Sequence, residues 1–197
     1  MKRSIRLHAL LCALAFSALT FAPAANAQEL IVNGSFETGS FAPWTLGWGN
    51  TSVVGSDSLF AHTGTHNAFL EDSGGIGTLS QTFNTVIGQQ YTISFWYAND
   101  ELDTNNMFAA FFNGVQGFSA SNVPIIGYTN VTFNAVATTA TSTLQFQFRH
   151  DVDFFRLDTV SVVPEPSTNV LLILSGAGLL GLVQYRRVKA RRATAVS

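Results

Sequence analysis

Cysteine is almost absent from this chain of 197 residues, because its one cysteine, Cys12, lies in the first hydrophobic segment. Once that segment is removed on export, the mature chain has no thiol. Disulfides, thiolate metal sites and cysteine nucleophiles are therefore excluded. Stability must come from a hydrophobic core, and the roughly 136 residues between positions 28 and 163 are enough to build one.

Basic residues are scarce in the same stretch, where Arg149 and Arg156 stand against eleven acidic side chains. The net charge of this part of the chain is about −9. Phosphate groups would be repelled by it, which excludes nucleic acids and anionic membrane surfaces as partners. The other Lys and Arg residues lie at the two ends of the chain.

The N-terminal end has the three parts of a secretory signal peptide. Three basic side chains occur within the first six residues, Leu7–Phe21 is almost unbroken apolar sequence, and Ala25-Asn26-Ala27 forms an A-x-A cleavage site. The alternative is an uncleaved membrane anchor, but the apolar run is short and is followed by Pro23 and small residues. We therefore assign residues 1–27 to a signal peptide.

Residues 28–163 show short β-branched and aromatic runs between clusters of Gly, Asn, Asp and Ser. Apolar and polar side chains alternate in three of these runs, as expected for antiparallel strands with one face on a core. No helical periodicity occurs before residue 168. The predicted fold is all-β, an antiparallel β-sandwich of jelly-roll type. The alternating runs are Tyr91–Tyr97, Val131–Asn134 and Leu144–Arg149, and further expected strands are Leu30–Phe36, Asn67–Leu70, Thr78–Phe83, Phe108–Phe112 and Phe155–Val163.

The last part of the chain, residues 164–197, has a different character. A proline-flanked glutamate, Pro164-Glu165-Pro166, is followed by the apolar stretch Val170–Val183 and then by five basic residues. This order predicts a C-terminal transmembrane helix whose basic end stays in the cytoplasm. A buried core helix is the alternative, but the flanking prolines and basic residues do not suit it.

These three features in this order resemble the PEP-CTERM sorting signal. The resemblance implies that an exosortase acts at Pro164, Glu165 and Pro166 and removes the tail, in a bacterium that makes exopolysaccharide. The expected localisation is an inner-membrane-anchored precursor that becomes a protein of the cell surface or extracellular matrix.

Two short segments of the middle domain, Asn33–Glu37 and Phe155–Val162, resemble the ends of galactose-binding-like jelly rolls, a group that includes many carbohydrate-binding modules. Ala61–His66 is similar to a turn of those proteins. The resemblance implies a structural Ca²⁺ ion held by Glu37 and Asp158, which suits calcium's preference for oxygen ligands. The usual second aspartate is Thr159 here. Alternatively, Glu37 is a solvated turn residue, and Asp158 binds Arg156 or a main-chain amide.

The alternating strands also suggest a surface for sugar. Four side chains are expected to point outward, where the indole would stack on a sugar ring and the amides would bind hydroxyl groups. Two tryptophans that follow the first expected strand are alternative stacking groups. In the alternative interpretation, the indole of the first set packs beneath a loop and the amides are merely solvated. The first set is Trp96, Gln145, Gln147 and Arg149, and the alternative pair is Trp44 and Trp48.

Catalytic machinery is not recognisable. The adjacent carboxylates of Glu71 and Asp72 would point to opposite faces of a strand, so they are poorly placed to flank one glycosidic bond. The sequence therefore predicts a non-catalytic exported protein with exopolysaccharide as a candidate partner. The alternatives are a purely structural or adhesive protein and, third, a minor glycan hydrolase.

Overall fold

The computed structural model describes residues 28–47, 52–102, 105–165 and 185–186. The predicted signal peptide, Trp48, Pro166 and the apolar stretch 170–183 lie outside these residues. In the described part of the chain, no helix has the length and hydrophobicity to cross a bilayer. One compact unit covers residues 27–165, two residues beyond the predicted C-terminal boundary of the domain.

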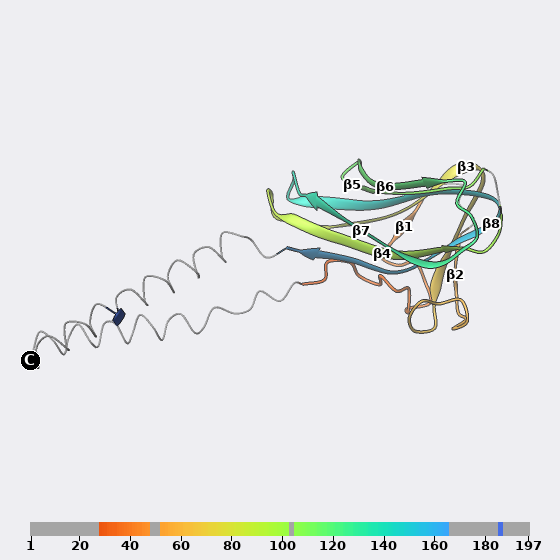
Figure 1. The fold of residues 1–197 in the computed structure, drawn as a ribbon, viewed down its shortest axis with the longest axis horizontal. Helices are drawn as coiled ribbons and strands as arrows, with labels where there is room; N and C mark the ends of the chain where they lie inside the picture. Colours follow the sequence, from red (N-terminus) through yellow and green to blue (C-terminus); the bar gives the residue numbers. More distant parts are fainter. Residues whose placement is uncertain (1–27, 48–51, 103–104, 166–184, 187–197) are drawn as a thin grey trace, which may run out of the picture. The chain divides into compact units, whose positions relative to one another are not determined.

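This unit is built from antiparallel strands in two layers, with β5 and β6 in one and β4 and β7 in the other (Figure 1). The strands described are β1 (Thr45–Leu46), β2 (Val53–Gly55), β3 (Asn67–Asn84), β4 (Gln90–Asn99), β5 (Met107–Phe112), β6 (Val115–Ser121), β7 (Ile126–Val136) and β8 (Thr141–Pro164).

Two long strands, β3 and β8, belong to both layers. The first half of β8 pairs with the second half of β3 and with β5, whereas its second half pairs with β4 and with Ala68–Leu70 of β3. Register shifts between Leu70 and Gly77 of β3 mark the place where the ladder changes layer. The predicted all-β sandwich is confirmed.

Aromatic rings fill the space between the layers. The Phe95 ring of β4 meets the Phe146 ring of β8 at 5.0 Å, edge to face, and Phe108 of β5 lies 5.9 Å from Phe95. All three side chains are completely buried. The alternation along β4 and β8 therefore gave the inward residues correctly, because successive side chains point to opposite faces of a strand.

The expected strand Leu30–Phe36 is wrong. Asn33 and Phe36 have positive φ angles of 57° and 58°, so this segment turns instead of extending. It still crosses β8 closely, because the Val160 N–H donates to the Gly34 carbonyl at 2.9 Å. A Cβ atom on Gly34 would lie 2.0 Å from the Val160 carbonyl oxygen, so only glycine fits at this crossing.

Candidate functional site

Trp44 belongs to the core. Its ring lies 5.9 Å from Phe36 and 6.1 Å from Phe146, and its Nε1–H donates to the Asn33 carbonyl at 3.1 Å. Only 6% of the residue is exposed. The interpretation of Trp44 as a stacking group for sugar is therefore wrong, since neither face of its indole reaches the surface.

Trp96 lies on β4, opposite Asn130 of β7 and Asp158 of β8. The imidazole of His62 stacks on its indole at 4.1 Å with an interplanar angle of 18°. Trp96 is half-buried as a result. Its position agrees with the alternative in which the indole lies beneath a loop, because His62 comes from the turn before β3.

The structure does not bring Trp96 together with Gln145, Gln147 and Arg149. These three residues lie on the first half of β8, in the layer of β5, whereas Trp96 is in the layer of β4. Their inward neighbours Phe95 and Phe146 meet across the core. Trp96 and the glutamines consequently face outward on opposite sides of the sandwich, so the predicted single surface is wrong.

Gln145 belongs to a row of outward side chains that runs across four neighbouring strands. Gln145 lies between Ser80 of β3 and Phe111 of β5, and Gln116 of β6 follows beyond Phe111. Phe111 is partly exposed. This set, Ser80, Gln145, Phe111 and Gln116, is called the amide row below. It places one aromatic ring between two carboxamides on the outer face of the layer.

A second row runs parallel to the amide row. Gln147 lies between Thr78 and Ala109, and its Nε2–H donates to Gln145 Oε1 at 3.1 Å. Farther along β8, Arg149 makes a two-point ion pair with Asp151, with N–O distances of 2.9 and 2.6 Å. Hydrogen bonds from this guanidinium lower the pKa of Asp151 to about 2. The carboxylate at this end of the face is therefore ionised and paired.

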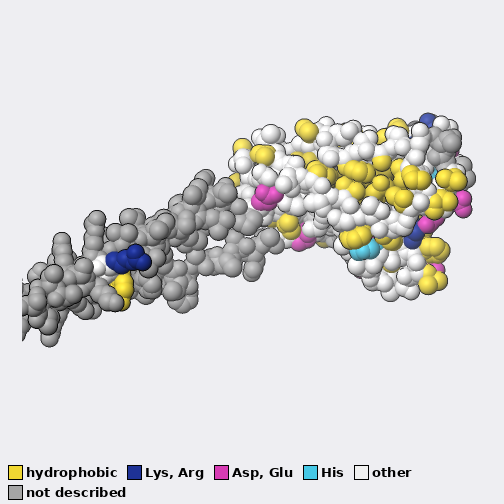
Figure 2. Space-filling view, viewed as in Figure 1, with side chains coloured by type: hydrophobic (Ala, Val, Ile, Leu, Met, Phe, Trp, Pro, Cys, Tyr) yellow, Lys and Arg dark blue, Asp and Glu magenta, His cyan; other side chains and the backbone are white. Residues whose placement is uncertain are grey.

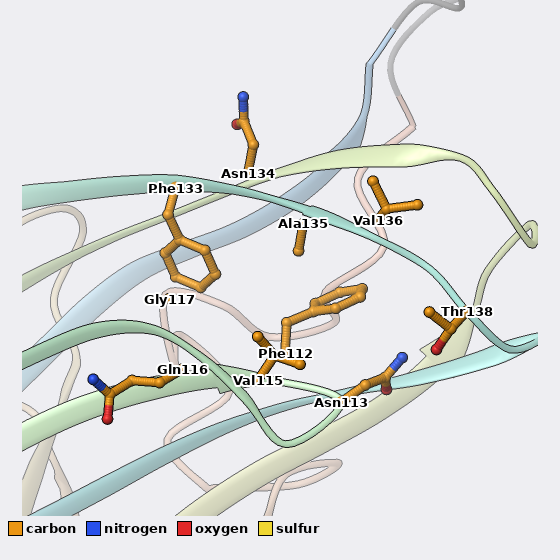
Figure 3. Close-up of a pocket in the computed structure, with 10 residues that line it drawn as sticks. All are labelled: Phe112, Asn113, Val115, Gln116, Gly117, Phe133, Asn134, Ala135, Val136 and Thr138. Carbon is orange, nitrogen blue, oxygen red and sulfur yellow. The ribbon is translucent and has the colours of Figure 1, made fainter.

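A cleft of about 290 Å³ opens beside the amide row, between the edge strands β6 and β7. In Figure 3 the rings of Phe112 and Phe133 face this space, whereas the Asn134 amide points away from it. A Cβ on Gly117 would lie 2.2 Å from the Phe133 ring, so glycine allows β6 and β7 to approach here. Hydrophobic side chains gather along the opening between the two layers (Figure 2). Gln116 lines the cleft and also belongs to the amide row.

Phe111 and Gln116 were not among the predicted site residues. The period-two pattern of Phe108, Ala110 and Phe112 does place Phe111 on the outer face of its strand. Its position beside Gln145 depends on the pairing of β5 with β8, which the sequence does not show.

Glu37 and Asp158 both bind the turn at residues 61–66. Asp158 Oδ2 accepts the N–H groups of His62 and Thr63 at 2.8 and 3.0 Å. Glu37 Oε1 accepts those of Thr65 and His66 at 2.9 and 2.8 Å. The His66 N–H lowers the pKa of Glu37, whereas burial raises the pKa of Asp158.

This arrangement does not suit a calcium site. Calcium takes six to eight oxygen ligands, but here N–H groups point at the carboxylate oxygens of Glu37 and Asp158. Within the described ranges, no group of three or more Asp, Glu, His or Cys side chains converges to hold a metal. Calcium binding stays a prediction from the resemblance.

A chelator titration tests the ion directly. If hydrogen bonds alone hold the turn, the melting temperature should not respond to chelator or to added Ca²⁺, in the wild type and in Glu37→Gln alike. An ion that binds only the folded state would raise the melting temperature by mass action. A chelator-sensitive wild type with an insensitive Glu37→Gln variant would restore the calcium site.

Two kinds of comparison identify what the chain resembles. The PEP-CTERM protein-sorting motif matches residues 162–188, so the chain carries this exosortase sorting signal. No protein of curated function matches the sequence.

Solved structures similar to the domain include carbohydrate-binding modules, adhesin domains and an enzymatically active domain of a bacteriophage tailspike protein. TmCBM61, solved with β-1,4-galactotriose, is 18% identical with a TM-score of 0.59, over 71% of this chain and 100% of that one. The CBM22-1 xylan-binding domain of Paenibacillus barcinonensis Xyn10C is 13% identical with a TM-score of 0.51, over 72% and 97%. The K3 cleaved adhesin domain of Porphyromonas gingivalis Lys-gingipain is 15% identical with a TM-score of 0.54, over 70% and 99%. These similarities establish the jelly-roll fold.

Proposed function

We propose that this protein is a non-catalytic carbohydrate-binding protein of the cell surface or extracellular matrix, released there after an exosortase removes its tail. The sorting motif supports the export route. The amide row supports the binding role, because it places Phe111 between the carboxamides of Gln145 and Gln116 on an outer sheet face.

The chemistry of this face suits a sugar chain. An aromatic ring packs against the apolar face of a pyranose, and carboxamides donate to and accept from its hydroxyl groups. Ser80 and Thr78 add hydroxyls on the neighbouring strand β3. Because residues 28–163 carry eleven acidic and two basic side chains, a neutral polysaccharide is favoured over an acidic one.

The character of these side chains also favours binding over hydrolysis. A glycosidase needs two carboxyl groups on either side of the scissile bond. The residues of the amide row are uncharged, and the carboxylate at the end of the face, Asp151, is paired with Arg149. The structural or adhesive alternative differs by predicting no saturable sugar binding.

A glycan array with residues 28–165 tests the proposal, and the endpoint includes Glu165 because it is bonded to β4. Gln145→Ala and Phe111→Ala should each weaken binding to a neutral glycan about tenfold, as expected for the loss of one hydrogen-bonding or stacking group. Thr132→Ala, on the outer face of β7 in the other layer, is the matched control and should bind normally. Melting curves would show that all variants are folded. Wild-type protein that captures no glycan saturably would exclude the binding role.

A further inference from the structure

The sorting motif begins inside the folded domain. The match starts at residue 162, and β8 continues to Pro164. Glu165 then donates its main-chain N–H to the Gln90 carbonyl of β4 at 2.9 Å. No linker therefore separates the sandwich from the first two residues of the proline–glutamate–proline motif.

The local register explains why a proline is accepted in this strand. Pro164 lies opposite Tyr91, and Thr92 lies opposite Val163. The next pair along the ladder, Gln90 and Glu165, is hydrogen-bonded. Hydrogen-bonded and non-hydrogen-bonded pairs alternate along an antiparallel ladder. Pro164 thus falls where the ladder with β4 needs no N–H.

Side chains of the domain hold Glu165 as well. Gln89 Nε2–H donates to the Glu165 carbonyl at 2.6 Å, and Thr92 Oγ1–H donates to Glu165 Oε1 at 3.0 Å. The main-chain N–H, the main-chain carbonyl and the carboxylate of the motif's glutamate are therefore all bonded to the 89–92 segment. Glu165 is half-buried in this position.

We propose that this contact masks the sorting motif, so that the exosortase acts only after the end of β8 has separated from β4. A membrane-embedded enzyme that recognises the motif must contact the main chain and the carboxylate of Glu165. Both are hydrogen-bonded to the domain. The opening equilibrium of three residues, Val163 to Glu165, then sets the rate at which the precursor loses its tail. The inference rests on the proposed processing by an exosortase.

Loosening the contact should speed processing. Thr92→Val keeps the β-branched shape of the side chain and removes the hydroxyl donor, and Gln89→Ala removes the amide donor. Since one hydrogen bond changes an equilibrium roughly fivefold, pulse-chase labelling in the producing bacterium should show precursor conversion about fivefold faster for each. Ser94→Ala, two residues along the same strand, is the matched control and should convert like wild type.

Fixing the contact should stop processing. Thr92 and Val163 are directly opposed across the ladder, and opposed Cα atoms in antiparallel strands lie at a separation that a disulfide can bridge. The double variant Thr92→Cys with Val163→Cys should accumulate as precursor and convert after reductant is added. Each single variant should convert without reductant, since Cys12 is the chain's only native cysteine.

Several outcomes would overturn the proposal. Equal conversion of wild type, Thr92→Val and the cross-linked variant would mean that the contact does not limit processing. Slower conversion of Thr92→Val would mean that the enzyme reads the docked motif. Hydrogen exchange of the Glu165 amide in the purified full chain tests the contact without any processing enzyme. Exchange should be faster in Thr92→Val than in the wild type. Unchanged exchange would refute the proposal that this contact protects the motif. A wild-type tail that is never removed would refute it too.

Discussion

Trp44→Ala should destabilise the domain strongly. The indole fills the space between the turn at Phe36 and the core ring of Phe146, and it is 6% exposed. Removing a large buried aromatic side chain costs about 3–5 kcal/mol of unfolding free energy. Urea unfolding of residues 28–165, followed by circular dichroism, measures this loss.

Trp44→Phe separates the packing of the ring from its hydrogen bond to the Asn33 carbonyl. The smaller ring keeps part of the core contact but leaves the Asn33 carbonyl without its indole donor, so we expect a loss of about 1–2 kcal/mol. Glycan binding by the folded fraction should be unchanged in both variants, because the amide row lies on the outer face of the layer. Full stability of Trp44→Ala would contradict the buried position of the indole.

The alternation of side chains determined which residues face inward, but it could not assign strands to layers. Phe95 and Phe146 both face the core, but they do so from opposite layers. A period-two pattern specifies only the two faces of one strand. Which strands are neighbours depends on hydrogen bonding between segments that are distant in the sequence. The prediction therefore placed Trp96 and Gln145 on one surface, whereas the structure has them in different layers.

The sequence pattern also failed for two further segments, one that forms a strand and one that does not. The strand β6 reads Val-Gln-Gly-Phe-Ser-Ala-Ser, and its residues are mostly exposed, so no apolar alternation marks it. Leu30–Phe36 showed the opposite error, since its apolar residues suggested a strand although Asn33 and Phe36 adopt left-handed angles. Phe36 is completely buried, and this burial stabilises a backbone conformation that local propensity disfavours.

Motif resemblance correctly brought the 61–66 turn together with the carboxylates of Glu37 and Asp158. Thr159, where the usual pattern has a second aspartate, donates to Asp158 and adopts a positive φ of 50°. Main-chain N–H groups therefore bind both carboxylates, and the calcium ion stays a prediction from the resemblance.

Asp158 is the centre of that arrangement, and Asp158→Ala should have the second large effect on stability. The carboxylate is completely buried and accepts N–H groups from His62, Thr63 and Thr159. Hydrogen bonds to a charged group contribute about 1.5–3 kcal/mol, and unpaired donors add a desolvation cost. Burial of the charge opposes this gain, as the raised pKa of Asp158 indicates, so we expect a net loss of about 3 kcal/mol in urea unfolding.

Asp158→Asn should recover about half of this loss. One amide oxygen can still accept from the 62–63 main chain, but the NH₂ group then meets the Thr159 N–H, and two donors cannot pair. Glu37→Gln is the matched control on the other side of the turn. Its side chain is 43% exposed, so solvent replaces the lost interaction and the cost should stay below about 1 kcal/mol. If Asp158→Ala were no more harmful than Glu37→Gln, the buried carboxylate would not be what fixes the turn to β8, and the stacking of His62 on Trp96 would have to hold it instead.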